Sequence, residues 1–574
     1  ASSLGPRRLG PLLVEGGAEF GVWAPRVRSL AVRVGGRTVP LEPEDRGVWR
    51  GAVEGAGAGD DYVLLLDGER ERPDPRSMFQ PYGVHGPSRL VDRGPPPAPF
   101  ATPDLRDLVF YELHCGTFTP EGTFDAAIGR VGHLAGLGVT AVEVMPVAAF
   151  PGSRGWGYDG VDLYAVHAAY GGPAGFRRFV DACHQAGLAV FLDVVYNHLG
   201  PDGNYLAEFG PYFTDRFATP WGEAVNLDGP GSDFVRGFVL DNAEHWVAGY
   251  GVDGLRLDAV HHLHDASSVH ILEELASRVH AARPGAVVVA ESDLHQPLLI
   301  NAYGVDATWA DDLHHALHVA LCGETSGYYD GFQHLETLAK VLTTGWAFTG
   351  QYYPYLDRRH GRDPAGLGGE RFVVCTQNHD QIGNRAFGDR LAALVGPDLD
   401  AVASVLLACS PFLPLLFQGQ EWGSTRPFLY FTDHEPGLAV SVRRGRREEF
   451  AAFGWDEVPD PNDPATFERS KLDWSRAAGQ TLELWRTLLR LRREVPALGN
   501  CRRDLATARV DPERRLVVLE RDDPSGSRAV VAANLGEGSQ HIPVDTGKLR
   551  LRVATRPGLP SGDLSGASAA VWTT

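Results

Sequence analysis

The chain has 574 residues, enough for two or three domains with ample apolar cores. Its 53 basic and 73 acidic residues give a formal net charge of −20, and no basic stripe occurs, so we expect no nucleic-acid partner. No run of about eighteen apolar residues occurs, so we expect no membrane partner. The 12 Trp, 17 Tyr and 26 Phe provide faces on which a neutral sugar could stack, although most are expected in the core.

Cysteine usage bears on the compartment. The six cysteines are widely spaced and include no Cys-x-x-Cys pair. Several fall inside predicted strands or helices, where free cysteine is usual. The first residues lack the apolar segment of a secretion signal. We therefore expect reduced cysteines and a cytoplasmic location.

Residues 1–92 have the pattern of an N-terminal β-sandwich, which we expect to be immunoglobulin-like. Short apolar stretches at 20–25, 30–34 and 62–66 are each followed by proline or glycine turns. The stretch 94–99 contains four prolines and acts as a stiff spacer, so the domain boundary is placed there. The expected role of this domain is packing against the next one, with glycan binding as the alternative.

From residue 104 to 495, apolar strands alternate with amphipathic helices, which predicts right-handed parallel crossovers and a (β/α)8 TIM barrel. The strands are predicted at 109–113, 139–145, 190–193, 252–257, 287–290, 304–309, 372–378 and 412–418. The helices are predicted at 124–137, 172–186, 234–248, 269–282, 401–409 and 481–495. A long loop (199–232) and an insertion (425–474) interrupt the pattern, and such segments are usually functional. Residues 500–574 return to short strands and predict a small C-terminal β-sheet domain.

Charged side chains follow the ends of several barrel strands. Arg256 precedes Asp258 by two residues, so both side chains project to one side of the sheet. Glu291 and Asp380 follow two other strands, and the carboxyl ends of all strands meet at one face of a barrel. Adjacent strands lie about 4.8 Å apart. That spacing suits the two carboxyl groups of a retaining glycosidase, which are about 5–5.5 Å apart.

The surroundings of the two acids predict different roles. The Arg256 guanidinium should lower the pKa of Asp258, as a nucleophile requires, and the apolar strand before Glu291 should raise the pKa of that acid. A single acid at a strand end could instead cap a helix or form a loop salt bridge. Several such strand ends together favour an active site. The other groups expected to hold the sugar are Asp380, His198 and His379.

Four strand-end segments resemble the ordered signature regions of the α-amylase family of glycoside hydrolases. They are Asp193-Val194-Val195-Tyr196-Asn197-His198, Gly254-Leu255-Arg256-Leu257-Asp258, Ala290-Glu291 and Asn378-His379-Asp380. The resemblance covers residues 104–495 and implies Asp258 as nucleophile, Glu291 as acid/base and Asp380 as transition-state stabiliser. It also implies that Arg256, His198 and His379 complete the subsite of the cleaved glucose. Tyr158, in Trp156-Gly157-Tyr158-Asp159, is similar to the family's stacking aromatic, with plain packing as the alternative.

Within that family, three segments and the N-terminal β-sandwich are similar to the maltooligosyltrehalose trehalohydrolases. The segments are 73–88, 259–262 and 311–315. This likeness implies hydrolysis of the α-1,4-glucosidic bond next to a terminal trehalose, with release of trehalose from a maltooligosaccharide. The expected aglycone contacts are His261, His262 and Asp311, with ordinary loop residues as the alternative. A maltooligosyltrehalose-forming enzyme of the same pathway is a further expected partner.

Neither a cofactor nor a metal is expected. Asn197 occupies a position where amylases often place a calcium ligand, but the loop after it lacks a dense Asp/Asn cluster. Three other functions stay open from the sequence. The chain could be a glycogen-branching enzyme, a general α-1,4-glucan hydrolase, or a non-catalytic glycan-binding relative, although relatives of that last kind typically lose the acids.

Overall fold

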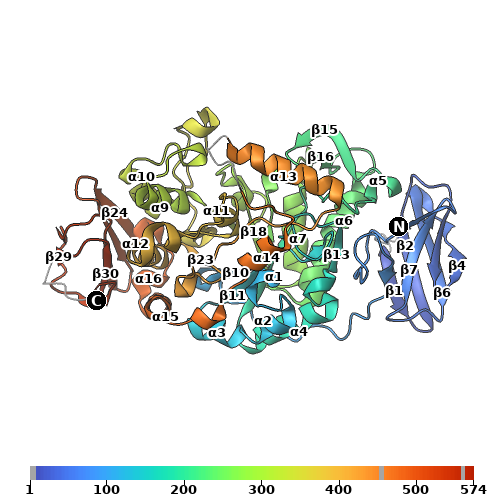
Figure 1. Ribbon diagram of the computed structural model, residues 1–574, viewed down its shortest axis with the longest axis horizontal. Coiled ribbons are helices and arrows are strands. Elements are labelled where there is room, and N and C mark those ends of the chain that lie inside the picture. The colour runs from blue at the N-terminus through green and yellow to red at the C-terminus, as the bar shows by residue number, and fades with distance from the viewer. Residues whose placement is uncertain (1–7, 452–457, 557–562) are drawn as a thin grey trace.

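The computed structural model describes residues 8–451, 458–556 and 563–574. The start of the predicted sandwich (1–7), with the expected absence of a secretion signal, and the middle of the predicted insertion (452–457) lie outside the described residues. The described chain has three parts in a row (Figure 1). Two small sheets form the N-terminal end, a closed barrel lies in the centre, and a further sheet forms the C-terminal end.

The N-terminal part consists of two facing antiparallel sheets. The strands of the first, in spatial order, are β1 (Gly10–Val14), β2 (Gly17–Trp23), β6 (Val48–Glu54) and β5 (Glu42–Pro43). Those of the second are β4 (Arg37–Pro40), β3 (Leu30–Val34), β7 (Asp61–Leu66) and β8 (Arg70–Arg72), with β9 (Ser88–Arg89) also paired to β7. Alternate side chains such as Phe20, Val32 and Leu64 are buried between the sheets, as period-2 patterning requires.

The sandwich is tied to the barrel by arginine–carboxylate pairs. Arg70 and Arg72 both bind Glu208, at 2.7 and 2.9 Å, and Arg76 binds Asp241 at 2.8 Å. Arg76 is itself buried. These contacts fix the N-terminal domain against loop 199–232 of the barrel and the helix that follows this loop.

Eight parallel strands close the central barrel, which confirms the predicted fold class. In order around the barrel they are β10 (Phe110–Leu113), β11 (Ala141–Val144), β14 (Ala189–Val194), β17 (Gly254–Leu257), β18 (Val287–Ala290), β19 (Ala307–Trp309), β22 (Phe372–Cys375) and β23 (Leu413–Phe417). β19 is three residues shorter than predicted. β22 ends at Cys375 rather than 378, because Asn378 leaves the strand to cap helix α11 (His379–Gly383).

Inside the barrel, an apolar layer lies below a polar one. Phe110, Phe191, Val289 and Leu415 pack together at the N-terminal end of the strands. On several strands the inward side chains nearer the C-terminal end are polar instead. They include Glu112, Asp193 and Arg256, and Glu143 lies beside Glu112 as its register partner. The polar layer therefore forms the floor of the C-terminal face.

Helices cover the outside of the barrel. The main ones are α4 (Gly172–Gln185), α6 (Ser232–Glu244), α7 (Ile271–Ala282), α9 (Asp312–Cys322), α10 (Leu335–Thr344), α12 (Leu391–Cys409) and α15 (Gln480–Glu494), and η4 (His245–Tyr250) extends α6 with π-type geometry. The single helix predicted at 124–137 is wrong. It is two helices, α2 (Phe124–Ile128) and α3 (Val131–Leu137), because Gly129 supports the helix poorly and ends α2.

Helix α12 begins ten residues earlier than predicted and is apolar enough, by length and composition, to cross a membrane. Half of it is buried inside the protein, and its second turn is broken at Gly396 before Pro397. Its buried side chains, such as Val405 and Leu406, belong to the main core. It is therefore a central helix of the folded domain.

The two predicted interruptions both contain regular structure. Loop 199–232 carries α5 (Leu206–Phe209) and a hairpin of β15 (Phe213–Thr219) and β16 (Gly222–Val225). The insertion carries α13 (Pro436–Ala451), α14 (Pro464–Ser470) and η10 (Trp474–Arg476). After α15, Pro496 starts the short helix α16 (Pro496–Gly499), since proline suits a first helical turn.

The C-terminal sheet follows α16. Its strands, in spatial order, are β24 (Ala506–Asp511), β25 (Leu516–Asp522), β26 (Arg528–Asn534), β30 (Ser568–Thr573) and β28 (Arg550–Ala554). A second ladder pairs β27 (Gln540–His541) with β29 (Asp563–Leu564). All six cysteines lie in the described chain and are free, and all but Cys322 are buried.

Candidate active site

Arg256 is the centre of the candidate site. Its side chain is fully buried on β17, and its Nη1 donates hydrogen bonds to both carboxylate oxygens of Asp193, at 2.9 Å each, and to Asp258 Oδ1 at 2.8 Å. Its Nη2 lies 2.9 Å from Glu291 Oε2 as an ion pair without hydrogen-bond geometry. The guanidinium also lies over the ring of Trp309, 4.2 Å from its centroid. One cation therefore holds three carboxyl groups.

Asp258 directly follows β17 and accepts two directed hydrogen bonds. Asn197 Nδ2 donates to its carboxylate at 2.8 Å, and Arg256 donates to the other oxygen. Burial alone would raise the pKa of Asp258, but the Arg256 guanidinium, His198 and the Asn197 amide outweigh it and lower the pKa of the carboxyl. The sequence-based expectation of a lowered pKa agrees with this direction, so Asp258 is ionised at neutral pH.

Glu291 follows β18 and differs from Asp258 in its charge state. Burial, and then the carboxylates of Asp258 and Asp380, raise the pKa of Glu291 well above its usual range, although Arg256 opposes them. Its Oε2 accepts the backbone N–H of Ala259 at 2.8 Å. Ala259 has a φ of +38°, a strained value for a residue with a Cβ, and this backbone turns the N–H toward Glu291. Glu291 is thus poised to donate a proton.

Asp380 and His379 lie in the first turn of α11. The Asp380 side chain is 37% exposed, and its Oδ1 lies 3.5 Å from His379 Nε2. The His379 ring stacks on Tyr158 with centroids 5.2 Å apart. The Tyr158 hydroxyl donates to Asp193 Oδ2 at 2.6 Å and lies 2.8 Å from His379 Nε2. Tyr158 is therefore both packed on His379 and joined to the polar floor.

His198 lies on the other side of Asp258 and has an aromatic cover that the sequence pattern did not predict. Trp221, between β15 and β16, stacks on His198 with centroids 4.2 Å apart and an interplanar angle of 11°. It also meets the edge of His262. Trp221 is 49% exposed, which is unusual for a tryptophan without a ligand. The sequence signal for this exposed hairpin tip is an aromatic residue between two turn-forming residues, Pro220 and Gly222.

A cavity of about 320 Å³ opens beside Glu291 and Asp380. It extends toward the ends of β18, β19 and β22. Asp311 lies in its wall and accepts a hydrogen bond from Gln381 Nε2 at 3.2 Å. Burial raises the pKa of Asp311 to about 6, although His315 opposes it. Other lining residues, which the sequence reasoning missed, are Asp293, His295, Asp312, Tyr353, Tyr355 and His360.

His261 and His262 lie directly after the nucleophile strand, beside Asp293 and Trp221. Both belong to a single 3-10 turn, η5 (Val260–His262), and among the described residues neither lines this cavity. His261 faces Asp293, with Nε2 3.5 Å from its carboxylate, so it reaches the cavity only through that side chain. His262 meets Trp221 instead. The contact of these two histidines with the aglycone sugar stays a prediction.

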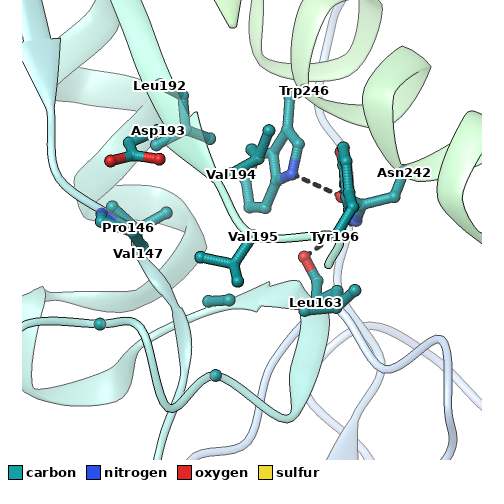
Figure 2. A pocket seen from close by; sticks show the side chains of 13 residues that line it. Pro146, Val147, Leu163, Leu192, Asp193, Val194, Val195, Tyr196, Asn242 and Trp246 are labelled. Atoms are coloured by element: carbon teal, nitrogen blue, oxygen red, sulfur yellow. Dashed lines mark hydrogen bonds between the residues drawn. The ribbon is translucent and has the colours of Figure 1, made fainter. Parts of the chain in front are cut away.

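A second hollow lies behind β14 and is separate from the site (Figure 2). Its volume is only about 10 Å³, and Asp193 is the one candidate-site residue in its wall. Figure 2 shows Trp246 donating to Asn242, and Tyr196 donates to the same Asn242 oxygen at 2.7 Å. Room for at most one water and a satisfied lining make this a packing gap.

Comparison with known proteins agrees with this geometry. Residues 97–215 match the family model "Alpha amylase, catalytic domain". A malto-oligosyltrehalose trehalohydrolase from Rhizobium sp. (strain M-11) is 49% identical over 85% of this chain and 86% of its own length. Another from Arthrobacter ramosus is 47% identical over 94% and 93%. A crystal structure of an alpha amylase candidate from Salmonella typhimurium superposes with a TM-score of 0.92 and 38% identity, over 98% of this chain and 99% of that one.

The barrel, its three carboxyl groups around one arginine and these matches define a glycoside hydrolase, and the chain belongs to the α-amylase family. It is a glycosidase. Within that family it belongs with the malto-oligosyltrehalose trehalohydrolases, which it matches over most of its length at 42–49% identity.

Proposed function

We propose that this glycosidase hydrolyses the α-1,4-glucosidic bond next to the terminal trehalose of a maltooligosyltrehalose and releases trehalose. The cavity beside Glu291 carries the proposal, because it lies on the side of the acid that protonates the leaving group. In this proposal the leaving group occupies that cavity. The names of the relatives support trehalose as the sugar that this pocket receives.

The proposed reaction is a double displacement. Ionised Asp258 attacks the anomeric carbon of the cleaved glucose while Glu291 gives its proton to the departing glycosidic oxygen, which forms a glycosyl–enzyme ester and free trehalose. Glu291, now ionised, takes a proton from water, and that water cleaves the ester and restores Asp258. Contact of both carboxyl groups with the one Arg256 guanidinium supports the close spacing that this route needs. No step needs a metal or cofactor.

The remaining residues would hold the two sides of the scissile bond. On the glycone side we assign Tyr158 to stacking, and Arg256, His198 and His379 to fixing the cleaved glucose and its acids. Asp380, exposed at the mouth of the cavity, is assigned to the sugar hydroxyls in the transition state. On the aglycone side we assign Asp311 and Gln381, which both line the cavity, to the trehalose hydroxyls, with His261 and His262 as further candidates.

Specificity tests the proposal. A site built to hydrogen-bond a particular ring orientation rejects another ring because buried donors are left unpaired, at about 1–3 kcal/mol each. We expect kcat/KM to be at least about tenfold higher for a trehalose-ended maltooligosaccharide than for a maltooligosaccharide of equal length, roughly 1.4 kcal/mol. Product analysis by chromatography measures this. Equal rates would indicate a general α-1,4-glucan hydrolase, and new α-1,6 branches on amylose a branching enzyme.

Stereochemistry gives a separate test. A double displacement inverts the anomeric carbon twice, so the new reducing end released by hydrolysis should first appear as the α-anomer. Proton NMR during the first minutes of turnover resolves the two anomers before mutarotation mixes them. A β-anomer at early times would exclude the nucleophilic role of Asp258, while leaving the substrate preference untouched.

The proposed substrate also implies a reaction before this one. A maltooligosaccharide with a 1,1-linked end must come from an enzyme that converts the reducing-end α-1,4 bond into an α,α-1,1 bond, so a maltooligosyltrehalose-forming enzyme is the proposed pathway partner. We propose a cytoplasmic location, which the six free cysteines support.

A further inference from the structure

Two glutamates lie side by side in the polar floor of the barrel. Glu112 on β10 and Glu143 on β11 are register partners, and each is 1% exposed. Glu112 accepts the backbone N–H of His379 at 3.1 Å and pairs closely with Nδ1 of the same ring. Neither carboxyl oxygen of Glu143 has a hydrogen-bond partner among the described residues. The reaction proposed above uses neither residue.

The protons around His379 can be counted. Tyr158 has one hydroxyl proton, and its oxygen lies 2.6 Å from Asp193 Oδ2 and 2.8 Å from His379 Nε2. Asp193 is ion-paired with Arg256, and burial raises its pKa to about 6. Above that pH it is a carboxylate that can only accept, so it takes the Tyr158 proton. His379 Nε2 must then donate to Tyr158. Nδ1 faces the carboxylate of Glu112, which also only accepts, so the ring carries both protons.

We propose that Glu112 is a positioning residue that keeps His379 doubly protonated and holds its Nε2–H toward Tyr158 and Asp380. Glu112 lies beneath the site and acts only through His379. The inference rests on the site assignment proposed above. It makes the chain Glu112–His379–Tyr158–Asp193–Arg256 one continuous set of hydrogen bonds from the first barrel strand to the cation that holds both catalytic acids.

The charges around the ring agree with this count. The titratable groups that face His379 from the surrounding elements are Glu112 and His114 (β10 and its end), Glu143 (β11), Tyr158, Asp193 (β14), Arg256 (β17) and Asp380 (α11). Burial would lower the pKa of His379, but Glu112 and then Asp380 outweigh it and raise that pKa to about 10. The effect of Asp380 alone would be smaller, so Glu112 maintains the charge.

Glu143 provides a matched control on the neighbouring strand. Burial, and then the Glu112 carboxylate, raise the pKa of Glu143 well above its usual range, so this side chain is neutral at the pH of the assay. A Glu143→Gln substitution therefore removes no charge, whereas Glu112→Gln removes one. The two variants change the same chemical group, at the same height in the barrel, with different electrostatic consequences.

The test is the pH profile of kcat/KM on the trehalose-ended substrate. In Glu112→Gln we expect an alkaline limb near the ordinary histidine pKa of 6.5, with activity falling about tenfold per pH unit above it. In Glu143→Gln the profile should keep the wild-type shape. Glu112→Asp retains the charge, so its kcat/KM should be lower at every pH but should fall at the same alkaline pH as in the wild type. A Glu112→Gln profile of wild-type shape, at any height, overturns the proposal.

A spectroscopic measurement reads the protonation of His379 in the wild-type enzyme directly. With ¹³C-labelled histidine, the Cε1 signal of His379, assigned by its loss in His379→Asn, should stay at the imidazolium position in the wild-type enzyme to about pH 9. Titration of that signal below about pH 8 would refute the proposal directly. Failure of the site assignment can be told apart from failure of this proposal. Normal turnover by Asp258→Asn would refute the assigned site, whereas the pH profile and the NMR titration report only on the charge of His379.

Discussion

Asp258→Asn and Glu291→Gln variants should each lose about four orders of magnitude in kcat, or about 5 kcal/mol of transition-state stabilisation. Asp258 must be ionised to attack, and the Arg256 guanidinium keeps its pKa low in spite of burial. Glu291 must be protonated to release the sugar, and burial keeps its pKa high. The amide variants keep size and shape, so the loss should reflect chemistry rather than packing.

The two roles can be separated with a substrate whose leaving group needs no proton. Fluoride departs without acid assistance, so a maltosyl fluoride should restore the first step of Glu291→Gln by several orders of magnitude and leave Asp258→Asn inactive. Thermal unfolding close to that of the wild-type enzyme serves as the control for folding. Near-normal turnover of either variant on the natural substrate, or equal rescue of both by the fluoride, would contradict the assigned roles.

The barrel and its catalytic end could be predicted because the relevant strands are short and apolar and are each followed, within five residues, by an acid. In a parallel barrel all such ends meet at one face. The two-residue spacing of Arg256 and Asp258 placed both on the same side of β17, and the structure joins them at 2.8 Å. The apolar stretch before Glu291 predicted desolvation, and the raised pKa of that acid agrees.

What could not be predicted depends on side chains that meet from distant strands. Glu112 and Glu143 each interrupt an apolar strand, and a single buried acid in such a strand does not reveal its partner. The spacing of two residues predicted that Arg256 pairs with Asp258. Its contacts with Asp193 and Glu291 could not be predicted, because these acids belong to neighbouring strands and are 63 and 35 residues away in the sequence. Trp221 reaches His198 from a hairpin tip.

The orientation of His261 and His262 has a local cause that the sequence pattern does not predict. His261 and His262 were expected to face the leaving sugar because they follow the nucleophile strand directly. The positive φ of Ala259 turns the chain into a 3-10 turn at once, and this sends the two rings toward Asp293 and Trp221. Sequence patterns predict which strand a residue follows, but they do not predict the direction of the chain after a strained residue.

Replacing Arg256 with Met should both inactivate the enzyme and destabilise it by about 3–5 kcal/mol, the usual cost of removing one partner from a buried ion pair. Asp193, Asp258 and Glu291 would lose the buried cation that they share. The nucleophile would also lose the charge that lowers its pKa. Methionine fills a similar volume, so the effect should be electrostatic rather than a cavity.

The pH dependence of this destabilisation distinguishes a lost cation from lost packing. Burial already raises the pKa of Asp193 to about 6 in the wild type, and without Arg256 it should rise further. The pKa of Asp258 should rise as well, because the cation is the strongest of the groups that oppose its burial. When the pKa of a carboxyl group is higher in the folded than in the unfolded state, protonation stabilises the fold. This contribution to the free energy of unfolding is complete below the pKa of the unfolded state and is lost as the pH rises through the pKa of the folded state. The stability deficit of Arg256→Met against the wild type should therefore be small near pH 4 and full near pH 7, as measured by thermal unfolding.

Arg492→Met is the matched control for this experiment. Arg492 is also buried, but its guanidinium donates to the backbone carbonyls of Ala408, Ser410 and Phe412 rather than to carboxylates. Its removal leaves uncharged acceptors unpaired, and these do not titrate, so its deficit should be the same at both pH values. If the stability deficit of Arg256→Met were also independent of pH, the charge states of the three carboxyl groups would not depend on this cation. The difference in charge state between Asp258 and Glu291 would then need another explanation.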